Sequence, residues 1–191
     1  MIQNVIGQID SPLKGILESK ASRNATEMAL IHNVMLRGLN CIYLQAPNVI
    51  QLQDIADFMD FCDAWSYVLH SHHGTEETMY FPLLEKQCKV KGVLARNHAE
   101  HELFLPGLFK FDIWVNGVKD NGKEYNGEEL RKLIDAFGEP LETHLRNEIV
   151  LLHGLEKDVG IDWDLMGKTM AQHSKKVADR VCISEDFRDL G

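Results

Sequence analysis

Two steps of the form His-x-x-x-Glu carry the chemistry that this sequence most clearly predicts. They are His72 with Glu76 and His144 with Glu148, in separate expected helices. Four residues make about one helical turn, so each step would project an imidazole and a carboxylate from the same helix face. If both faces turn inward, together with a histidine from each of two further helices, these groups would converge on one interior point. This mixture of ligands predicts a two-metal site and favours iron.

The two further histidines are expected to be His32 and His101. His32 shares a helix face with Met28, Leu36 and Leu39, and His101 shares one with leucine and phenylalanine side chains. Such apolar faces turn toward the core of a helical protein. A single histidine on such a face is more often a core residue bonded to a backbone carbonyl. The metal hypothesis therefore depends on the whole set.

The second expected helix offers a choice between two pairs at the same spacing, His72 with Glu76 and His73 with Glu77. The helix face of His72 is rich in apolar residues, including Phe61, whereas that of His73 carries more polar ones. We therefore expect His72 and Glu76 to point inward and His73 and Glu77 to lie nearer the rim. A buried, unpaired glutamate costs several kcal/mol, which favours a compensating cation beside Glu76.

Helical periodicity dominates the sequence, and the alternation typical of strands is nearly absent. We expect four long helices and a shorter fifth, over residues 24–45, 50–87, 93–115, 128–157 and 160–180. Long helices with mostly short connections predict an all-α, up-down-up-down four-helix bundle with an extra C-terminal helix packed outside. We expect one domain over 1–191, with its bundle core at about 24–158 and a C-terminal helical extension at about 160–191.

Local signals place the expected helix ends. Asn24 and Glu27 have the spacing of a capping box, which predicts the start of the first helix. The second helix could be interrupted at Gly74 and Pro82, and residues 116–127, rich in Asn, Gly and Lys, are expected to form a loop.

The motifs together resemble those of the hemerythrin-like (HHE cation-binding) family. The run from His72 to Pro82, HHGTEETMYFP, is similar to the H-H-x-x-E-E…F-P signature of that family. The other pieces follow in family order and include His32-Asn33, the segment from Glu100 to Phe104, and HLRNE from His144 to Glu148. The resemblance implies a four-helix bundle around two iron ions joined by an oxo or hydroxo bridge. It also implies four terminal histidine ligands and two bridging glutamates, respectively His32, His72, His101 and His144, and Glu76 and Glu148.

The sequence departs from the oxygen-carrying hemerythrins at two points. Those proteins have a second histidine four residues before the one that matches His101, where this chain has Asn97. They also use Asp, one residue farther along, in place of Glu148. Two octahedral irons with four imidazoles, two bridging carboxylates and a bridging oxygen keep about two open positions, against about one for a five-histidine site. Whether His98 fills one of these positions is left open.

An iron pair with open positions can bind O2. We therefore expect a non-heme di-iron protein that binds O2, or that senses iron or oxygen as the site fills and empties. The alternative is a di-iron oxygenase or oxidase, in which an open position admits a small organic substrate. A metal-free helical interaction module is a third reading, but it leaves Glu76 and Glu148 without a compensating charge.

Composition narrows the partners and the compartment. The 20 Lys and Arg against 29 Asp and Glu, a net charge of -9, argue against binding to nucleic acid or to an anionic membrane surface. The N-terminus lacks a basic segment followed by an apolar run, and no stretch has the length of a membrane span. The four scattered cysteines are expected to be reduced and mostly buried, as in a cytoplasmic protein, and are Cys41, Cys62, Cys88 and Cys182.

Overall fold

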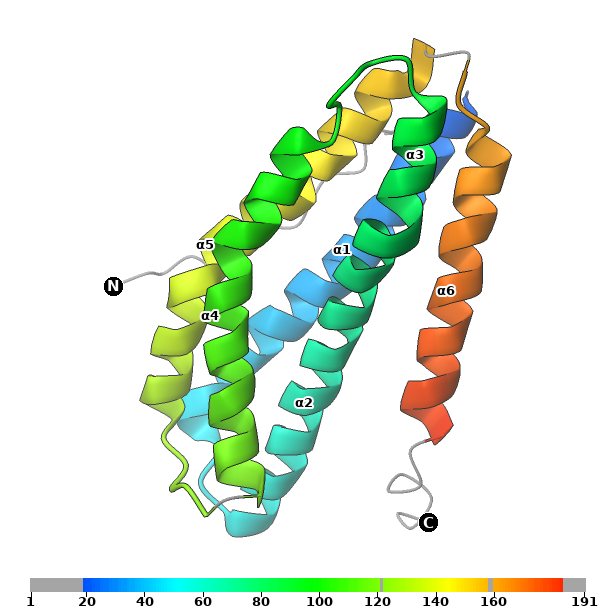
Figure 1. Cartoon of the computed structure of the whole chain (residues 1–191). Coiled ribbons are helices and arrows are strands. Elements are labelled where there is room, and N and C mark those ends of the chain that lie inside the picture. Colours follow the sequence, from blue (N-terminus) through cyan, green and yellow to red (C-terminus); the bar gives the residue numbers. More distant parts are fainter. Residues whose placement is uncertain (1–18, 121, 158–159, 184–191) are drawn as a thin grey trace.

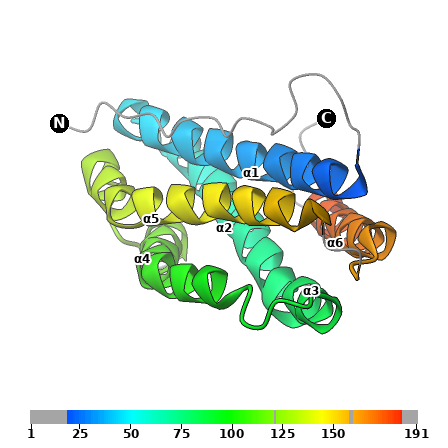
Figure 2. The same cartoon turned by 90° about the horizontal axis from the view of Figure 1, so that it is seen from above.

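The computed structural model describes residues 19–120, 122–157 and 160–183, without the side chains of 173, 174 and 176–183. Four long helices run alternately up and down and pack in a closed ring, with one further helix outside it (Figures 1 and 2). The elements are α1 (Lys20–Gln45), α2 (Leu52–Thr75), a π-helical turn (Glu76–Tyr80), α3 (Phe81–Gln87), α4 (Ala95–Asp120), α5 (Gly127–Gly154) and α6 (Trp163–Ile183). The expected all-α bundle with an extra C-terminal helix is confirmed.

The ring places α2 between two neighbours. Helix α1 packs against α2 and α5, and α4 packs against α2 and α5, while α6 lies along α1, α2 and the π-helical turn. Helices α2 and α3 continue one another through that turn (Figure 1). None of the described helices combines the length and the apolar character that crossing a bilayer requires.

Two expected boundaries are wrong. Helix α1 begins at Lys20, where the Ser19 side chain accepts a hydrogen bond from the Ser22 amide, and not at the predicted capping box. Asn24 instead donates to the Trp163 carbonyl at 3.0 Å and so connects α1 to the start of α6. Helix α4 continues to Asp120, so the expected loop over 116–127 is much shorter.

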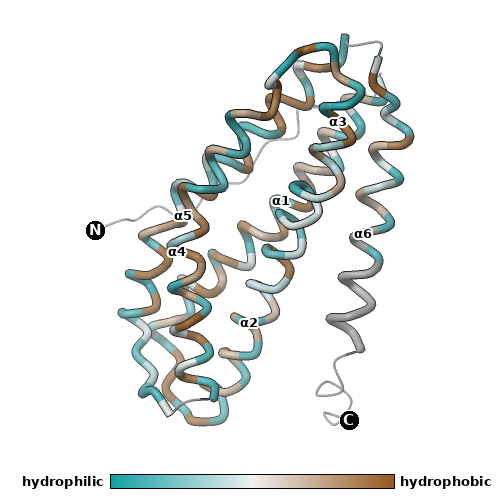
Figure 3. The backbone as a smooth tube through the Cα atoms, viewed as in Figure 1, coloured by the Kyte–Doolittle hydropathy of each residue, from teal (hydrophilic) through white to brown (hydrophobic). Residues whose placement is uncertain are grey.

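Apolar side chains fill the end of the bundle where α1 leads into α2. Along α1, α2, α4 and α5 apolar and polar residues alternate with the helical turn (Figure 3). Most of the apolar ones belong to the buried core. Trp65, Phe111 and Phe137 form an aromatic cluster with ring centroids 5.5 to 6.3 Å apart. The Trp65 indole also donates to the Met35 carbonyl at 2.9 Å. This cluster fixes the spacing of four helices beside the candidate site.

The cysteines differ from expectation in their burial. Cys41, Cys62 and Cys88 are free, but Cys41 is exposed and Cys88 is half-buried. Only Cys62 of these three is buried in the core, and burial raises the pKa of its thiol far above the ordinary value. The side chain of Cys182 lies outside the described residues.

The close approach of α4 to α5 at Gly107 gives a stability prediction. A Cβ atom at Gly107 would lie 2.6 Å from Cβ of Phe137, so one helix must shift. We expect Gly107→Ala to lower the free energy of unfolding by about 1–2 kcal/mol, because overpacking outweighs the gain in helix propensity. Urea unfolding of the metal-free protein measures this change.

Gly74→Ala is the matched control, since a Cβ at Gly74 meets no atom within 4 Å. It is expected to leave the stability unchanged or raise it by up to about 1 kcal/mol. Equal stabilities for the two variants would contradict the packing argument.

Candidate metal centre

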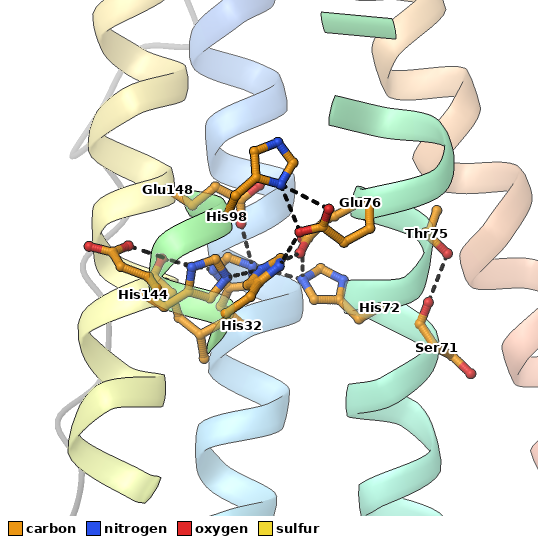
Figure 4. Close-up of polar contacts among 12 residues, drawn as sticks. His32, Ser71, His72, Thr75, Glu76, His98, His144 and Glu148 are labelled. Atoms are coloured by element: carbon orange, nitrogen blue, oxygen red, sulfur yellow. Dashed lines mark hydrogen bonds and ion pairs between the residues drawn. The ribbon is translucent and has the colours of Figure 1, made fainter. Parts of the chain in front are cut away.

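The structure brings all six predicted ligands together in the interior of the bundle. They come from α1, α2, the π-helical turn, α4 and α5, and none of them is more than 4% exposed. Figure 4 shows several of these side chains converging between the helices. The six are His32, His72, Glu76, His101, His144 and Glu148.

The side chains form two groups, and each group has four ligand atoms within 4.8 Å of one another. The first group consists of His32, His72, Glu76 and Glu148, and the second of His73, Glu76, His101 and His144. Glu76 belongs to both groups and therefore stands between them. Glu148 belongs to the first group alone, so its predicted bridging position stays a prediction.

The expectation that His73 lies near the rim is wrong. Its side chain is only 4% exposed, whereas Phe61, from the face predicted to point inward, is 43% exposed. Because α2 packs against α1 on one side and α4 on the other, two neighbouring stripes of its surface face inward. His72 then points to the first group and His73 to the second. The adjacent pair of histidines in the sequence was the signal for this arrangement.

The π-helical turn begins at the shared carboxylate. The Phe81 amide donates to the Glu76 carbonyl, five residues earlier, in place of the four-residue step of an α-helix. Such wide turns insert one residue and rotate the following side chains, and they are frequent at functional sites. Here Glu76 and Tyr80, at the two ends of the turn, and Phe81 directly after it are buried, while Met79 is exposed.

Hydrogen bonds hold two of the imidazoles with a nitrogen free toward the interior. Nδ1 of His32 donates to the Leu145 carbonyl at 3.0 Å, and Nδ1 of His101 donates to the Glu77 carboxylate. In a neutral imidazole this leaves a lone pair on Nε2. These Nε2 atoms lie 3.0 Å from Nε2 of His72 and of His144, respectively. Partners of this kind orient metal-binding histidines.

The carboxylate of Glu100 lies behind His144. Its Oε2 is 3.6 Å from Nδ1 of His144, and its Oε1 accepts hydrogen bonds from Arg96 and Asn147. The sequence motifs gave no role to Glu77 or Glu100. Their positions directly beside the predicted ligands Glu76 and His101 were the signal that they could hold ligating histidines in place.

Several buried atoms of the two groups lack a hydrogen-bond partner among the described residues. They include both nitrogens of His73 and both oxygens of Glu76 and of Glu148. Nε2 of His72 approaches Glu76 Oε1 to 2.8 Å, but without the geometry of a hydrogen bond. Buried groups left in this state cost free energy, and imidazole nitrogens with carboxylate oxygens suit a transition metal. The residues therefore fit the metal that their spacing predicts.

Burial and mutual charges set the protonation of the centre. Burial lowers the pKa of His73 well below its ordinary value and that of His144 to about 3, so both are neutral at pH 7. Burial acts to raise the pKa of Glu76, but the surrounding histidines outweigh it and hold that pKa well below the ordinary value. Burial and the charge of Glu76 raise the pKa of Glu148. Burial acts to lower the pKa of His72 and His101, but the neighbouring carboxylates outweigh it and raise both. Because metal binds neutral imidazoles and ionised carboxylates, a bound ion would displace the protons that these raised pKa values favour.

His98 lies outside both groups. Its side chain is 40% exposed, and its Nδ1 donates to Glu77 at 2.9 Å. Asn97, at the position where the oxygen carriers have a histidine, is buried. The fifth candidate imidazole is therefore His73, from α2 rather than α4.

Comparison with known proteins gives a family match over the part of the chain that contains all the candidate ligands. The family model of the hemerythrin HHE cation binding domain matches residues 24–154. A curated protein of Cryptosporiopsis sp. (strain 8999), named dimeric xanthone biosynthesis cluster protein R11, is 31% identical over 149 residues. The match covers 78% of this chain and 56% of the relative, so the chain spans about half the length of that protein. No solved structure matches significantly.

Protonation of His144 gives a pH prediction for the metal-free protein. Its pKa is about 3 when folded and near 6.5 when unfolded, so between these values the unfolded chain binds a proton that the folded chain does not. Stability is therefore lost as the pH falls below about 6.5, by about 1.4 kcal/mol per pH unit for this histidine. Urea unfolding from pH 7 to 5 measures the slope.

His144→Leu should reduce that slope by this amount, and replacement of the exposed His153 by Ala should not. The same slope in His144→Leu as in the wild type would show that His144 does not stay neutral in the fold.

Proposed function

Because the chain belongs to the hemerythrin HHE cation-binding domain family, we propose that its two ligand groups hold two iron ions and that the site binds O2 reversibly. The protein would act as an O2-binding protein or as a sensor of oxygen or iron. The observation that carries the proposal is the position of Glu76, which is within reach of both groups. A carboxylate shared in this way can hold two metal ions close together.

The number of imidazoles supports reversible binding. Two octahedral irons have about twelve positions, and five imidazoles, one bridging oxygen and two carboxylates would fill all but about one if Glu148 bridges as the sequence predicts. With four imidazoles, as the sequence alone predicts, about two positions would be open. His73 therefore brings the ligand number close to that of a five-histidine oxygen carrier. A pair of ferrous ions would supply the electrons that O2 binding requires.

The chain itself positions the ligands and packs aromatic rings beside them. The Leu145 carbonyl and the Glu77 carboxylate hold the rings of His32 and His101. Phe81 stacks on His101 with ring centroids 5.7 Å apart, and Phe104 lies 4.8 Å from the ring of His73. These aromatic rings cover part of the second group and limit the room for water there, which restricts side reactions at an oxidisable centre.

A specific observation also supports the oxygenase alternative. A cavity of about 320 Å³ between α1 and α6 is lined mainly by apolar side chains, including Met28 and Met170, and it reaches Tyr80. Burial and the charges of Glu148 and Glu76 raise the pKa of Tyr80, so its hydroxyl stays protonated beside the carboxylates. The cavity has the size and character of a small-ligand site. The name of the relative, a biosynthesis cluster protein, is compatible with this second candidate.

The test is anaerobic reconstitution with ferrous iron, followed by a visible spectrum when O2 is admitted and again when it is removed. The proposal predicts a charge-transfer band that appears with O2 and fades on deoxygenation. A transient band that decays while O2 is consumed would favour the oxygenase, and substrate screening with apolar molecules would follow. A protein that binds no iron would contradict both.

Iron content tests the ligand assignment. Glu76→Ala should lose most of the iron, because both groups lose a ligand, and His73→Ala should lower the content below two irons per chain. His98→Ala, in the same region but outside both groups, is the matched control and should keep two. Metal analysis after desalting measures the content. A Glu76→Ala protein that keeps two irons would refute the shared position of this carboxylate.

A further inference from the structure

A pocket of about 410 Å³ between α2 and α4, lined mostly by histidine and glutamate residues, opens onto the second ligand group. Its lining includes two candidate ligands, His73 and His101. Both are buried, and the two ring nitrogens of His73 have no hydrogen-bond partner among the described residues. The pocket therefore connects the surface with two candidate ligands, and the ring nitrogens of one of them, His73, lack a hydrogen-bond partner in the described part of the chain.

The same pocket also carries acidic and imidazole groups nearer the surface. Glu77 and His98 line it with side chains 39% and 40% exposed, and Glu102 is exposed beside them. The Glu77 carboxylate accepts from Nδ1 of His98 and from Nδ1 of the buried His101. It thus joins a half-exposed histidine to a candidate ligand.

From this arrangement we propose that the pocket is the route by which metal ions enter and leave the centre, with Glu77 and His98 as transient first ligands. The inference rests on the proposed metal binding and adds a path to it. An ion that leaves water must replace its hydration step by step, since losing all of it at once is far too costly. A half-exposed carboxylate and imidazole, followed by the buried His73 and His101, provide such a series.

Charge and polarity favour a cation over O2 as the species that uses this route. Glu77 and Glu102 give the pocket a negative potential, within a chain of net charge -9, and such a potential raises the rate at which cations arrive. An apolar diatomic gains nothing from these groups. The other cavity, between α1 and α6, is lined mainly by apolar side chains. None of the seven candidate ligands, which are the six predicted ones and His73, lines it, so it offers a cation no comparable series of ligands.

The experiment measures rates with ferrous iron alone as the probe. Metal-free protein is mixed anaerobically with Fe²⁺, and uptake is stopped at intervals with a chromogenic ferrous chelator. Release from the loaded protein to an excess of the same chelator gives the reverse rate. We expect His98→Ala to slow both by about tenfold, the change that about 1.4 kcal/mol in a barrier produces. The final content should stay at two irons per chain.

Two further variants act on the pocket by size and by charge. Gly74 lines the pocket and has open space around it, so Gly74→Phe should obstruct the route and slow both rates. Glu102→Gln should slow uptake at low salt, with an effect that fades at high salt because ions screen the charge. Neither residue belongs to the ligand groups.

Matched controls separate a route from a general disturbance. Ala171→Phe adds the same ring in the α1–α6 cavity, and Asp135→Asn removes an exposed charge on α5 that does not line the pocket. Both should load and release iron at wild-type rates. Wild-type rates in His98→Ala and Glu102→Gln would overturn the route, whether or not Gly74→Phe folds. A wild-type protein that binds no iron at equilibrium would instead overturn the proposed function.

Discussion

The burial of two carboxylates is the constraint on which the rest of the structure depends. Glu76 and Glu148 are fully buried, and their oxygens have no hydrogen-bond partner among the described residues. Such groups cost several kcal/mol unless a cation or a proton compensates them. A metal would remove this cost only in the folded state, so metal binding and folding should stabilise each other. Without metal, stability must come from elsewhere, and the aromatic cluster around Trp65 is well placed to supply it.

The two ligand groups differ in their access to solvent. In the first group His32 and Glu148 are completely buried, and His32 is held by a backbone carbonyl. In the second group His101 is held by Glu77, a side chain that reaches the surface. A backbone carbonyl on a packed helix cannot move alone, but a half-exposed carboxylate can. On the proposed function, the first group would be the rigid position and the second the one at which ligands exchange.

The sequence predicts best what depends on one helix alone. A four-residue step sets the relative direction of His72 and Glu76, or of His144 and Glu148, whatever packs around them. The burial of His73 was predicted wrongly because it depends on the packing of α2 against both α1 and α4. The helical periodicity of the α2 sequence alone cannot show that two of its faces are buried. The start of α1 was misplaced for a related reason. Asn24 can cap a helix, but its amide is used instead by the Trp163 carbonyl, far away in the chain.

The π-helical turn could not be predicted from periodicity, yet the centre depends on its position. The segment from His72 to Glu76 supplies three of the seven candidate ligands within little more than one turn. A continued α-helix would fix the direction of Tyr80 and Phe81 from that of Glu76. The wider turn makes the direction of Phe81 independent of that of Glu76. Helix α2 can therefore point its ligands at both groups while α3 still buries Phe81 against the ring of His101. The rotation of α2 about its axis can therefore follow the positions of the ligands, because the turn lets α3 take a different rotation that suits its own packing.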